Sequence, residues 1–376
     1  MSDNPLRRLH DFGQSPWLDF LSRGMLTTGE LAGLLEEDGI AGVTSNPAIF
    51  EKAILASDDY DEAIAGLAAE GKSAQQIYEI LTVEDVRSAA DLMRPMYDES
   101  EGLHGYVSLE VNPHLARDTE GTLDEARRLW GKVDRPNLFI KVPATVEGLP
   151  AIEQLISEGI NVNVTLLFGL PRYREVAEAC IAGLERRAAG GGPVHGIASV
   201  ASFFLSRIDV LIDPLLEEMI AAGGSDAEQA KRLRGEVAIA CAKLSYEIYH
   251  ELFGGARFAV LAGQGARVQR LLWASTGTKN PDYPDTKYVE PLIGPDTVNT
   301  LPLETIEAYR DHGDPASRLE DGLDEACATL DLLAEVGIDI DEVTAQLVEE
   351  GIDKFNKPYD KLLATLEEAV AKHGGG

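Results

Sequence analysis

Cysteine, basic residues and long apolar runs are all scarce in this 376-residue sequence. Only three cysteines occur (Cys180, Cys241 and Cys327) without a CxxC pair, so no disulfide framework is expected. The 33 basic residues are outnumbered by 64 acidic ones, and the formal charge of −31 argues against nucleic acid or an anionic membrane as a partner. No apolar stretch approaches a membrane span, and residues 1–10 lack the apolar core of a signal peptide. These absences predict a cytoplasmic protein that binds neither nucleic acid nor membrane.

Motifs for metal and nucleotide binding are also missing. The seven histidines show no HExxH or similar spacing, so no metal site is predicted. The stretch GQGA at 263–266 begins a GxG pattern, but it lacks a third glycine and precedes a predicted strand, which is the wrong context for a dinucleotide. The partner residues of a pyridoxal phosphate ring are not recognisable either, which disfavours that class of lysine enzyme.

What the sequence does contain is a regular alternation of short apolar runs and amphipathic helices. The predicted strands are 17–21, 39–46, 105–111, 137–144, 160–168, 196–204, 270–276 and 296–302. Helices 205–222 and 226–253 are predicted after the sixth strand, and helices 303–312 and 317–370 after the eighth. Eight strands, each followed by helix, predict an α/β protein with a single (β/α)8 TIM barrel and additional helices. A doubly wound open sheet is the alternative. No flexible linker divides residues 1–376, so a single domain is expected.

One lysine interrupts an otherwise apolar strand. Lys141 lies in NLFIKVPA (137–144), and lysine is rarely buried without a reason. Polar side chains also recur at alternate positions of the other predicted strands: Asp19, Asn46, Glu110, Asn163, Thr165 and Ser202. Alternate residues share a face, and helices cover the outside of a parallel barrel, so this polar face should point inward, where such barrels carry their active sites. A single buried polar group is usually just hydrogen-bonded, but a matched set predicts a site.

A lysine on this inward polar face of the barrel has a specific chemical use. Desolvation disfavours its ammonium form, and the neutral amine can attack a carbonyl substrate to form an imine. The protonated imine accepts electrons, so a neighbouring carbon–carbon bond can break. A carboxylate is then needed to take a hydroxyl proton, and Asp19 and Glu110 are the candidates.

Several motifs resemble transaldolases of the non-oxidative pentose phosphate pathway, within the class I Schiff-base aldolase superfamily. They are GVTSNP (42–47), VSLEV (107–111), FIKVPAT (139–145), EGINVNVTLLF (158–168), SFFLSRID (202–209) and LWASTGTKNPDY (272–283). The resemblance runs from about Asp19 to about Pro302. It implies a barrel that needs no metal or organic cofactor and acts on phosphorylated sugars, as a monomer or homodimer. The implied reaction transfers a dihydroxyacetone unit from sedoheptulose 7-phosphate to glyceraldehyde 3-phosphate, giving erythrose 4-phosphate and fructose 6-phosphate.

The resemblance also implies catalytic roles for four residues. Lys141 would form the Schiff base. Asp19 would accept the proton of the C4 hydroxyl during cleavage. Glu110 and Thr165 would hold a catalytic water that carries protons during imine formation and hydrolysis.

Substrate-binding roles follow from the same resemblance. Asn46 and Asn163 would bind the hydroxyls of the dihydroxyacetone unit and keep the enamine planar. Thr44 and Ser202 would support this pocket, and Phe204 would line it.

The phosphate site is expected around Arg207. This residue lies at the start of the helix after strand six, where a helix N-terminus favours an anion and a guanidinium adds two donors; a surface salt bridge is the alternative. Many transaldolases have Ser-x-Arg at the end of strand seven, whereas Ser275 here has no arginine two positions later. We therefore expect Ser275 and Lys279 as phosphate ligands. The long segment 279–297 could cover the site and bring Lys279 or Lys287 to the phosphate.

Two other functions stay open on the sequence alone. A Schiff-base lyase similar to fructose 6-phosphate aldolase would release the three-carbon unit to water. A catalytically silent barrel would only bind sugar phosphates, but an intact lysine with both carboxylates argues against it.

Overall fold

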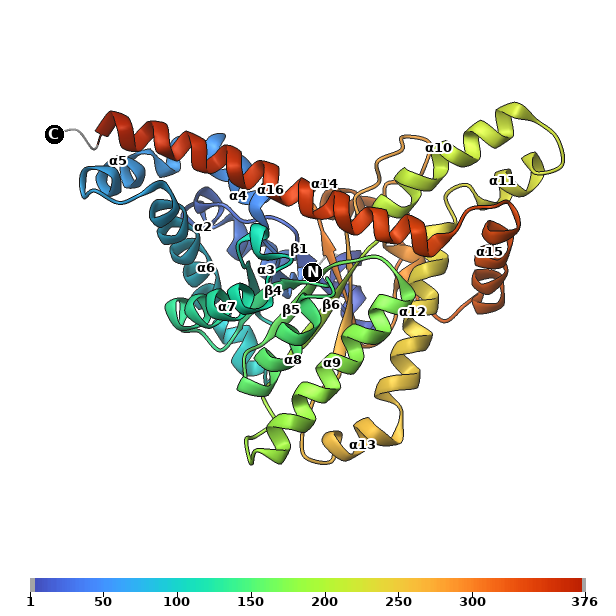
Figure 1. Ribbon diagram of the computed structural model, residues 1–376, viewed down its shortest axis with the longest axis horizontal. Coiled ribbons are helices and arrows are strands. Elements are labelled where there is room, and N and C mark those ends of the chain that lie inside the picture. Colours follow the sequence, from blue (N-terminus) through green and yellow to red (C-terminus); the bar gives the residue numbers. More distant parts are fainter. Residues whose placement is uncertain (1–3, 374–376) are drawn as a thin grey trace.

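The computed structural model describes residues 4–373 and shows eight parallel strands closed into a barrel (Figure 1). The strands are β1 (Gln14–Leu18), β2 (Gly42–Val43), β3 (Tyr106–Glu110), β4 (Leu138–Pro143), β5 (Val162–Leu167), β6 (Ser199–Phe204), β7 (Gln269–Ala274) and β8 (Thr297–Leu301). Each strand pairs with the next along the chain, and β8 pairs with β1 to close the barrel. The predicted (β/α)8 fold is confirmed, and the open-sheet alternative is wrong.

Helices follow the strands and form the outer layer. They are α1 (Pro5–Arg8), α2 (Arg23–Thr28), α3 (Glu30–Asp38), α4 (Pro47–Leu55), α5 (Asp61–Ala69), α6 (Ala74–Glu99), α7 (Thr119–Val133), α8 (Gly148–Glu158), α9 (Leu170–Ala189), α10 (Ser206–Ala222), α11 (Ala227–Leu233), α12 (Val237–Phe253), α13 (Ala256–Ala262), α14 (Leu303–His312), α15 (Leu323–Glu335) and α16 (Ile340–His373). Short 3-10 turns are η1 (Leu9–Phe12), η2 (Asp58–Tyr60), η3 (Pro113–Leu115) and η4 (Glu290–Leu292).

Two predicted helices are each divided in the structure. The helix expected over 226–253 is split into α11 and α12, and Gly235 between them has φ +77°. The helix expected over 317–370 is split into α15 and α16, and Gly337 between them has φ +83°. Glycine adopts this left-handed backbone without steric cost, so a helix commonly ends there.

The first strand begins and ends earlier than predicted. It covers Gln14–Leu18 instead of 17–21, so Asp19 follows the strand. Its early polar residues are bound inside the protein: the Gln14 amide donates to the Leu292 carbonyl at 2.7 Å. Asp19 therefore starts the loop that leads from the barrel to α2.

The long helix α16 crosses the end of the barrel at which the strands terminate. Figure 1 shows it running from beside α15 to α5 over the upper end of the barrel. It contacts α4, α6 and α10, as well as β5 and the turn η3 after β3. This C-terminal helix therefore forms part of the wall around the barrel mouth.

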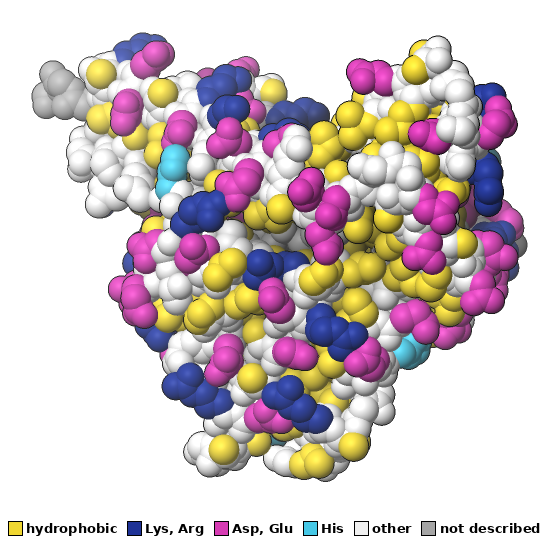
Figure 2. Space-filling model, turned by 45° about the vertical axis from the view of Figure 1, so that its right-hand side comes forward, with side chains coloured by type: hydrophobic (Ala, Val, Ile, Leu, Met, Phe, Trp, Pro, Cys, Tyr) yellow, Lys and Arg dark blue, Asp and Glu magenta, His cyan; other side chains and the backbone are white. Residues whose placement is uncertain are grey.

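The surface reflects the composition of the chain. On the face shown in Figure 2, acidic side chains are spread widely and Lys and Arg side chains lie among them. Within the described part of the chain, no helix combines the length and apolar character needed to cross a membrane.

Candidate active site

Lys141 lies inside the barrel near the end of β4. Its side chain is 4% exposed, and its Nζ donates a hydrogen bond to the Ser45 carbonyl at 3.1 Å. The register of the sheet places Glu110 of β3 and Asn163 of β5 directly beside it. Neighbours in register point to the same side of a sheet. The three side chains therefore form one row on the barrel wall.

Glu110 is the nearest carboxylate to this amine. Its Oε2 lies 3.6 Å from Lys141 Nζ, and its side chain is almost as buried as that of the lysine. Burial raises the pKa of Glu110 to about 7, although the Lys141 charge opposes this. Neither carboxylate oxygen has a hydrogen-bond partner among the described residues. A carboxyl that titrates near neutral pH can both give and take a proton.

A hydrogen-bonded chain orients the amide of Asn163. Ser202 Oγ donates to Asn163 Oδ1 at 2.7 Å, and Asn163 Nδ2 donates to Ser108 Oγ at 3.0 Å. All three residues are buried. The amide is thereby fixed next to Lys141, and Ser108, which is not among the predicted site residues, completes the chain.

Asp19 lies at the barrel mouth and is held by threonines. Thr44 Oγ1 donates to Asp19 Oδ1 at 2.7 Å and lies 2.7 Å from the Thr300 hydroxyl. Burial raises the pKa of Asp19, while the charge of Lys141 and the bond from Thr44 oppose the shift. Because the charges of Arg207 and Lys279 also lower its pKa, Asp19 lies within electrostatic reach of Lys141, Arg207 and Lys279.

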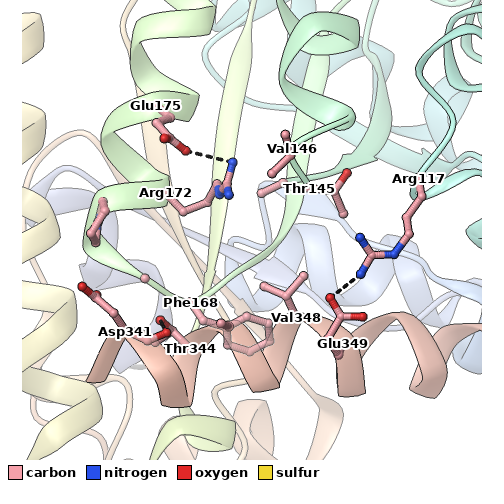
Figure 3. A pocket seen from close by; sticks show the side chains of 14 residues that line it. Arg117, Thr145, Val146, Phe168, Arg172, Glu175, Asp341, Thr344, Val348 and Glu349 are labelled. Carbon is pink, nitrogen blue, oxygen red and sulfur yellow. Dashed lines mark hydrogen bonds and ion pairs between the residues drawn. The ribbon is translucent and has the colours of Figure 1, made fainter. Parts of the chain in front are cut away.

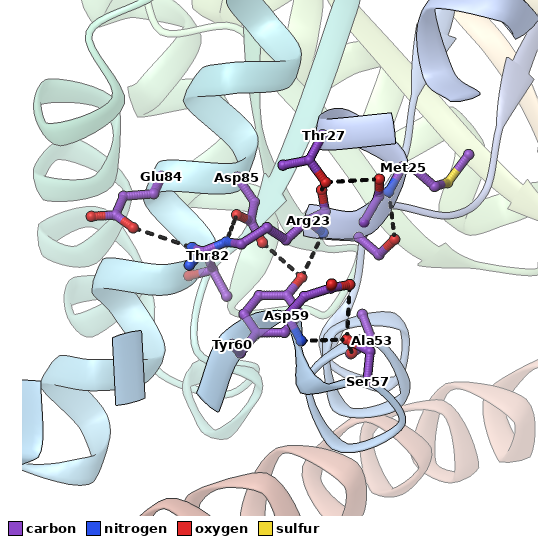
Figure 4. Close-up of polar contacts among 12 residues, drawn as sticks. Arg23, Met25, Thr27, Ala53, Ser57, Asp59, Tyr60, Thr82, Glu84 and Asp85 are labelled. Carbon is purple, nitrogen blue, oxygen red and sulfur yellow. Dashed lines mark hydrogen bonds and ion pairs between the residues drawn. The ribbon is translucent and has the colours of Figure 1, made fainter. Parts of the chain in front are cut away.

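The segment after Asp19 is fixed by a buried polar network (Figure 4). Arg23 Nε donates to Asp85 Oδ1 at 2.9 Å, and the Arg23 backbone N–H donates to the Tyr60 hydroxyl at 2.8 Å. The Tyr60 hydroxyl in turn donates to Asp85 Oδ2 at 2.8 Å. Buried charges are stable only when paired in this way. The network ties α2 to α6 and limits the freedom of the loop that carries Asp19.

Arg207 lies in the first turn of α10, as predicted. Its guanidinium carbon is 5.1 Å from the centre of the Phe204 ring, and its Nη1 has no hydrogen-bond partner within residues 4–373. Ser275 adopts φ +55°, and its hydroxyl lies 2.9 Å from the Ser206 hydroxyl beside Arg207. Such backbone strain in a residue other than glycine is concentrated at functional sites. Arg207, Ser206 and Ser275 thus form a polar cluster at the ends of β6 and β7.

Helix α16 completes the surroundings of this arginine. The Phe355 ring centre lies 5.8 Å from the Arg207 guanidinium carbon, so rings of β6 and α16 both contact this group. Glu350 also acts on the charge of Arg207. Burial nevertheless lowers the pKa of Arg207, since no carboxylate is close enough to compensate fully.

The two lysines of the segment 279–297 have different positions. Lys279 is exposed, and its charge reaches Asp19. Lys287 Nζ instead donates to the Gly235 carbonyl and lies 4.4 Å from the centre of the Tyr283 ring. The Tyr283 hydroxyl donates to Asp213 Oδ2 at 2.7 Å, so this part of the segment is fixed on α10. The Lys287 amine is already bound by protein groups, which favours Lys279 as the phosphate ligand from this segment.

Asn46 and Thr165 differ in which of their polar side-chain atoms lack a partner in the protein. Asn46 caps α4, because its Oδ1 accepts the Ile49 backbone N–H at 3.0 Å, so its NH2 group is the part available to a ligand. Thr165 is fully buried, and its hydroxyl has no hydrogen-bond partner in the described chain. It lies within an interruption of the β5–β6 register between Val164 and Leu167. Its neighbour Leu166 has φ +55°.

A separate cavity of about 330 Å³ lies beside the mouth, between α9 and α16 (Figure 3). Its two arginines are engaged: Arg117 pairs with Glu349, and Arg172 Nη1 lies 2.8 Å from Glu175 Oε2. Lys141 is not part of its lining. We therefore assign the chemistry to the barrel mouth and not to this neighbouring cavity.

Four residues that contact the site were not predicted, and they differ in whether the sequence held a signal for them. Thr300 and Ser108 follow the alternation of the strands, which indicates that their side chains point inward. Ser206 and Phe355 meet the site through contacts far apart in the chain, for which the sequence gives no signal. Among residues 4–373, no group of three or more metal-ligating side chains occurs.

Comparison with known proteins identifies the family. Residues 16–366 match the family described as Transaldolase/Fructose-6-phosphate aldolase. A transaldolase of Thiobacillus denitrificans is 50% identical over 94% of this chain and 97% of that protein. Transaldolases of Trichodesmium erythraeum and Thermobifida fusca are 49% and 48% identical, over 99% and 98% of this chain and 99% of each relative. The chain therefore belongs to the transaldolase/fructose-6-phosphate aldolase family.

Proposed function

We propose that this protein is a transaldolase, a transferase of the pentose phosphate pathway that acts through an imine on Lys141. It would move a dihydroxyacetone unit from sedoheptulose 7-phosphate to glyceraldehyde 3-phosphate, giving erythrose 4-phosphate and fructose 6-phosphate. The observation that carries the proposal is the buried Lys141 amine 3.6 Å from Glu110 Oε2. Sugar phosphates are cytoplasmic metabolites, and residues 1–376 would act there as a single domain.

Imine formation would use Lys141, Glu110 and Thr165. The amine attacks the ketone carbon of the substrate, and the resulting carbinolamine loses water. Protons must reach the departing hydroxyl and leave the nitrogen. Glu110, with a pKa raised to about 7, can supply both transfers through a water held with the Thr165 hydroxyl.

Cleavage would use Asp19. It accepts the proton of the C4 hydroxyl, the C3–C4 bond breaks, and its electron pair moves into the protonated imine to give an enamine. Asn163, fixed by Ser202, and the NH2 group of Asn46 would hold the hydroxyls of the three-carbon unit. The enamine then attacks the acceptor aldehyde, and hydrolysis of the new imine releases the product.

The phosphate group would bind at the ends of β6 and β7. Arg207 offers an Nη1 group without a protein partner among the described residues, and a guanidinium binds phosphate oxygens with two donors. Ser275 and the exposed Lys279 would complete the site, and Phe204 would hold the guanidinium from below. Thr44 would keep Asp19 in place.

Borohydride trapping tests this proposal. The protein is incubated with fructose 6-phosphate and sodium borohydride, and the digest is analysed by mass spectrometry. A three-carbon adduct is expected on the peptide that contains Lys141, together with loss of activity. Lys141→Arg should show neither, because a guanidinium remains protonated and cannot attack. Lys287→Arg, at a lysine outside the barrel, is the matched control and should label normally.

An adduct on another lysine, or full activity of Lys141→Arg, would contradict the mechanism. The family also includes fructose 6-phosphate aldolases, so transfer must be separated from release. Fructose 6-phosphate is therefore supplied with and without erythrose 4-phosphate. A transaldolase forms sedoheptulose 7-phosphate much faster than free dihydroxyacetone, and the opposite ratio would identify a lyase.

A further inference from the structure

A second cavity lies at the opposite end of the barrel, where the strands begin. It has a volume of about 390 Å³, within the range of small-molecule sites. Its inner wall includes Trp17, Tyr106 and Phe139, and Arg270 also lines it. Helix α13, which borders the cavity, lies at the lower end of the barrel in Figure 1, away from α16. The cavity is therefore separate from the site around Lys141.

Arg270 is a buried cation without a carboxylate partner in its hydrogen bonds. The residue is 8% exposed. Its guanidinium donates to the Ser15 hydroxyl at 2.7 Å and to the carbonyls of Leu103 and Thr297. Its Nε has no partner within the described residues. Burial lowers the pKa of Arg270 to about 10, so the group stays charged at neutral pH. Buried charges are normally paired, and Asp296, in the lining of the same cavity, is the carboxylate whose charge acts most strongly on Arg270.

The aromatic wall is flat and tightly packed. Trp17 is 1% exposed. The Tyr106 and Phe139 rings lie with their centres 4.4 Å apart, and Trp17 is 6.0 Å from Phe139. The cavity thus combines flat apolar walls with a buried guanidinium, which is the composition of a ligand site.

The entrance to the cavity is open. Leu103 at its rim is 47% exposed, and Ala262 at the end of α13 is exposed as well. The rim also carries Arg267, whose guanidinium binds the carbonyls of Glu101 and Gly102. The cavity therefore reaches the surface of the protein beside these residues.

We propose that this end of the barrel is a second binding site, for a small organic monoanion with a flat apolar body. The carboxylate would bind the guanidinium of Arg270, and the body would lie against Phe139, Tyr106 and Trp17. The charges limit the ligand to a single negative charge, because Arg270 and Arg267 are accompanied at the rim by the exposed carboxylate of Asp296. A phosphorylated sugar fits poorly, since it is a dianion without an apolar body.

Benzoate is the probe, and isothermal titration calorimetry of the full-length protein measures its binding. One benzoate should bind per chain with a Kd of about 1 mM or tighter. Benzamide has the same shape without the charge, and acetate has the charge without the ring. Both should bind at least about tenfold more weakly, since each lacks one of the two contacts.

Two variants locate the binding. Arg270→Gln removes the charge and should weaken benzoate at least about tenfold. Because this change could also unfold the barrel, Ala262→Trp serves as an independent variant that fills the entrance from an exposed position. Ala259→Trp is its matched control, since Ala259 is exposed on the same helix and does not line the cavity. Ala262→Trp should abolish binding, and Ala259→Trp should preserve it.

Three outcomes would overturn the proposal. They are absence of benzoate binding to the wild type, unchanged binding in Ala262→Trp, and displacement of benzoate by saturating fructose 6-phosphate in Lys141→Arg. The last result would place benzoate at the phosphate site of Arg207 instead.

Discussion

The two ends of the barrel are built on the same strands and carry opposite chemistry. At or just after the C-terminal ends of β1, β4 and β6, the inward residues are Asp19, Lys141 and Ser202. Two positions earlier on each chain segment the residues are Trp17, Phe139 and Val200, which line the lower cavity. Inward residues that are two positions apart therefore belong to different layers. The layer nearer the C-terminal ends of the strands is polar and reactive, and the layer below it is apolar.

Both ends leave buried polar groups without hydrogen-bond partners, but the groups differ in kind. Three groups at the upper end, the Glu110 carboxylate, the Thr165 hydroxyl and Arg207 Nη1, have no hydrogen-bond partner among the described residues. Such groups cost free energy when buried. At the lower end the unpartnered groups are Arg270 Nε and Trp17 Nε1, and aromatic contacts surround them. The unpartnered groups of the upper end include a carboxylate that can transfer protons, whereas those of the lower end are N–H donors.

The largest expected effect separates the two carboxylates of the upper end. Asp19→Asn cannot take the C4 hydroxyl proton, so kcat should fall by about 10²–10⁴-fold. The imine should still form, and borohydride should trap it before cleavage as a six-carbon phosphorylated adduct on Lys141. Glu110→Gln should instead slow the appearance of any adduct. Release of glyceraldehyde 3-phosphate by Asp19→Asn at the wild-type rate would remove Asp19 from the mechanism.

The second prediction concerns how much the ionisation of buried Glu110 lowers the free energy of unfolding. Burial raises its pKa to about 7, whereas the carboxyl in the unfolded chain ionises near about 4.3. Between these values the folded protein keeps a proton that the unfolded chain has released, so stability falls as pH rises through this window. Glu110→Gln has no such ionisation. Between about pH 5 and pH 8, the wild type should lose about 2–3 kcal/mol of unfolding free energy relative to the variant.

Urea unfolding at both pH values checks this result. Identical pH dependence of the two proteins would mean that Glu110 is not held near its neutral form. Burial of Glu110 at the upper end of the barrel would then not lower the free energy of unfolding.

The third prediction concerns the phosphate contact. Arg207→Ala should raise KM for fructose 6-phosphate by about 10–100-fold, since a charge-assisted hydrogen bond is worth about 1.5–3 kcal/mol. KM for dihydroxyacetone, which has no phosphate, should change little. Lys279→Ala should show a smaller bias of the same kind, because Lys279 is exposed. Arg172→Ala is the matched control, since Arg172 is paired with Glu175 in the neighbouring cavity.

The steady-state constants for both substrates decide the matter. Equal losses for the phosphorylated and the unphosphorylated substrate would exclude Arg207 as the phosphate ligand. If Arg172→Ala raised KM for the phosphorylated substrate as selectively as Arg207→Ala, any positive charge near the barrel mouth would be sufficient to bind the phosphate.

The alternation of the strands made much of this arrangement predictable. Lys141, Glu110 and Asn163 were found because polar residues with matching parity stand out in apolar strands, and the sheet register places them side by side. The start of β1 was missed because Gln14 and Ser15 are polar. Their partners, Leu292 and Arg270, lie far away in the chain.

Long-range contacts account for the remaining differences. The position of Ser206 beside Ser275 depends on two chain segments 69 residues apart. The contacts of Lys287 could not be predicted because the sequence does not show that Tyr283 bonds Asp213 and fixes the segment on α10. Local patterns determine which face a side chain takes, but not which distant segment covers it.

The smallest expected effect tests the lower end of the barrel as a source of stability. Phe139→Leu removes part of a ring that lies 4.4 Å from the ring centre of Tyr106, and the smaller side chain leaves a partly unfilled space. It should lower the free energy of unfolding by about 1–2 kcal/mol in urea. Val260→Ala, at a position 65% exposed on α13, should change it by less than about 0.5 kcal/mol. If Phe139→Leu were as stable as the wild type, the aromatic layer would not compensate for the free energy lost by burying the polar row above it. The two ends of the barrel would then differ in chemistry but not in their contribution to stability.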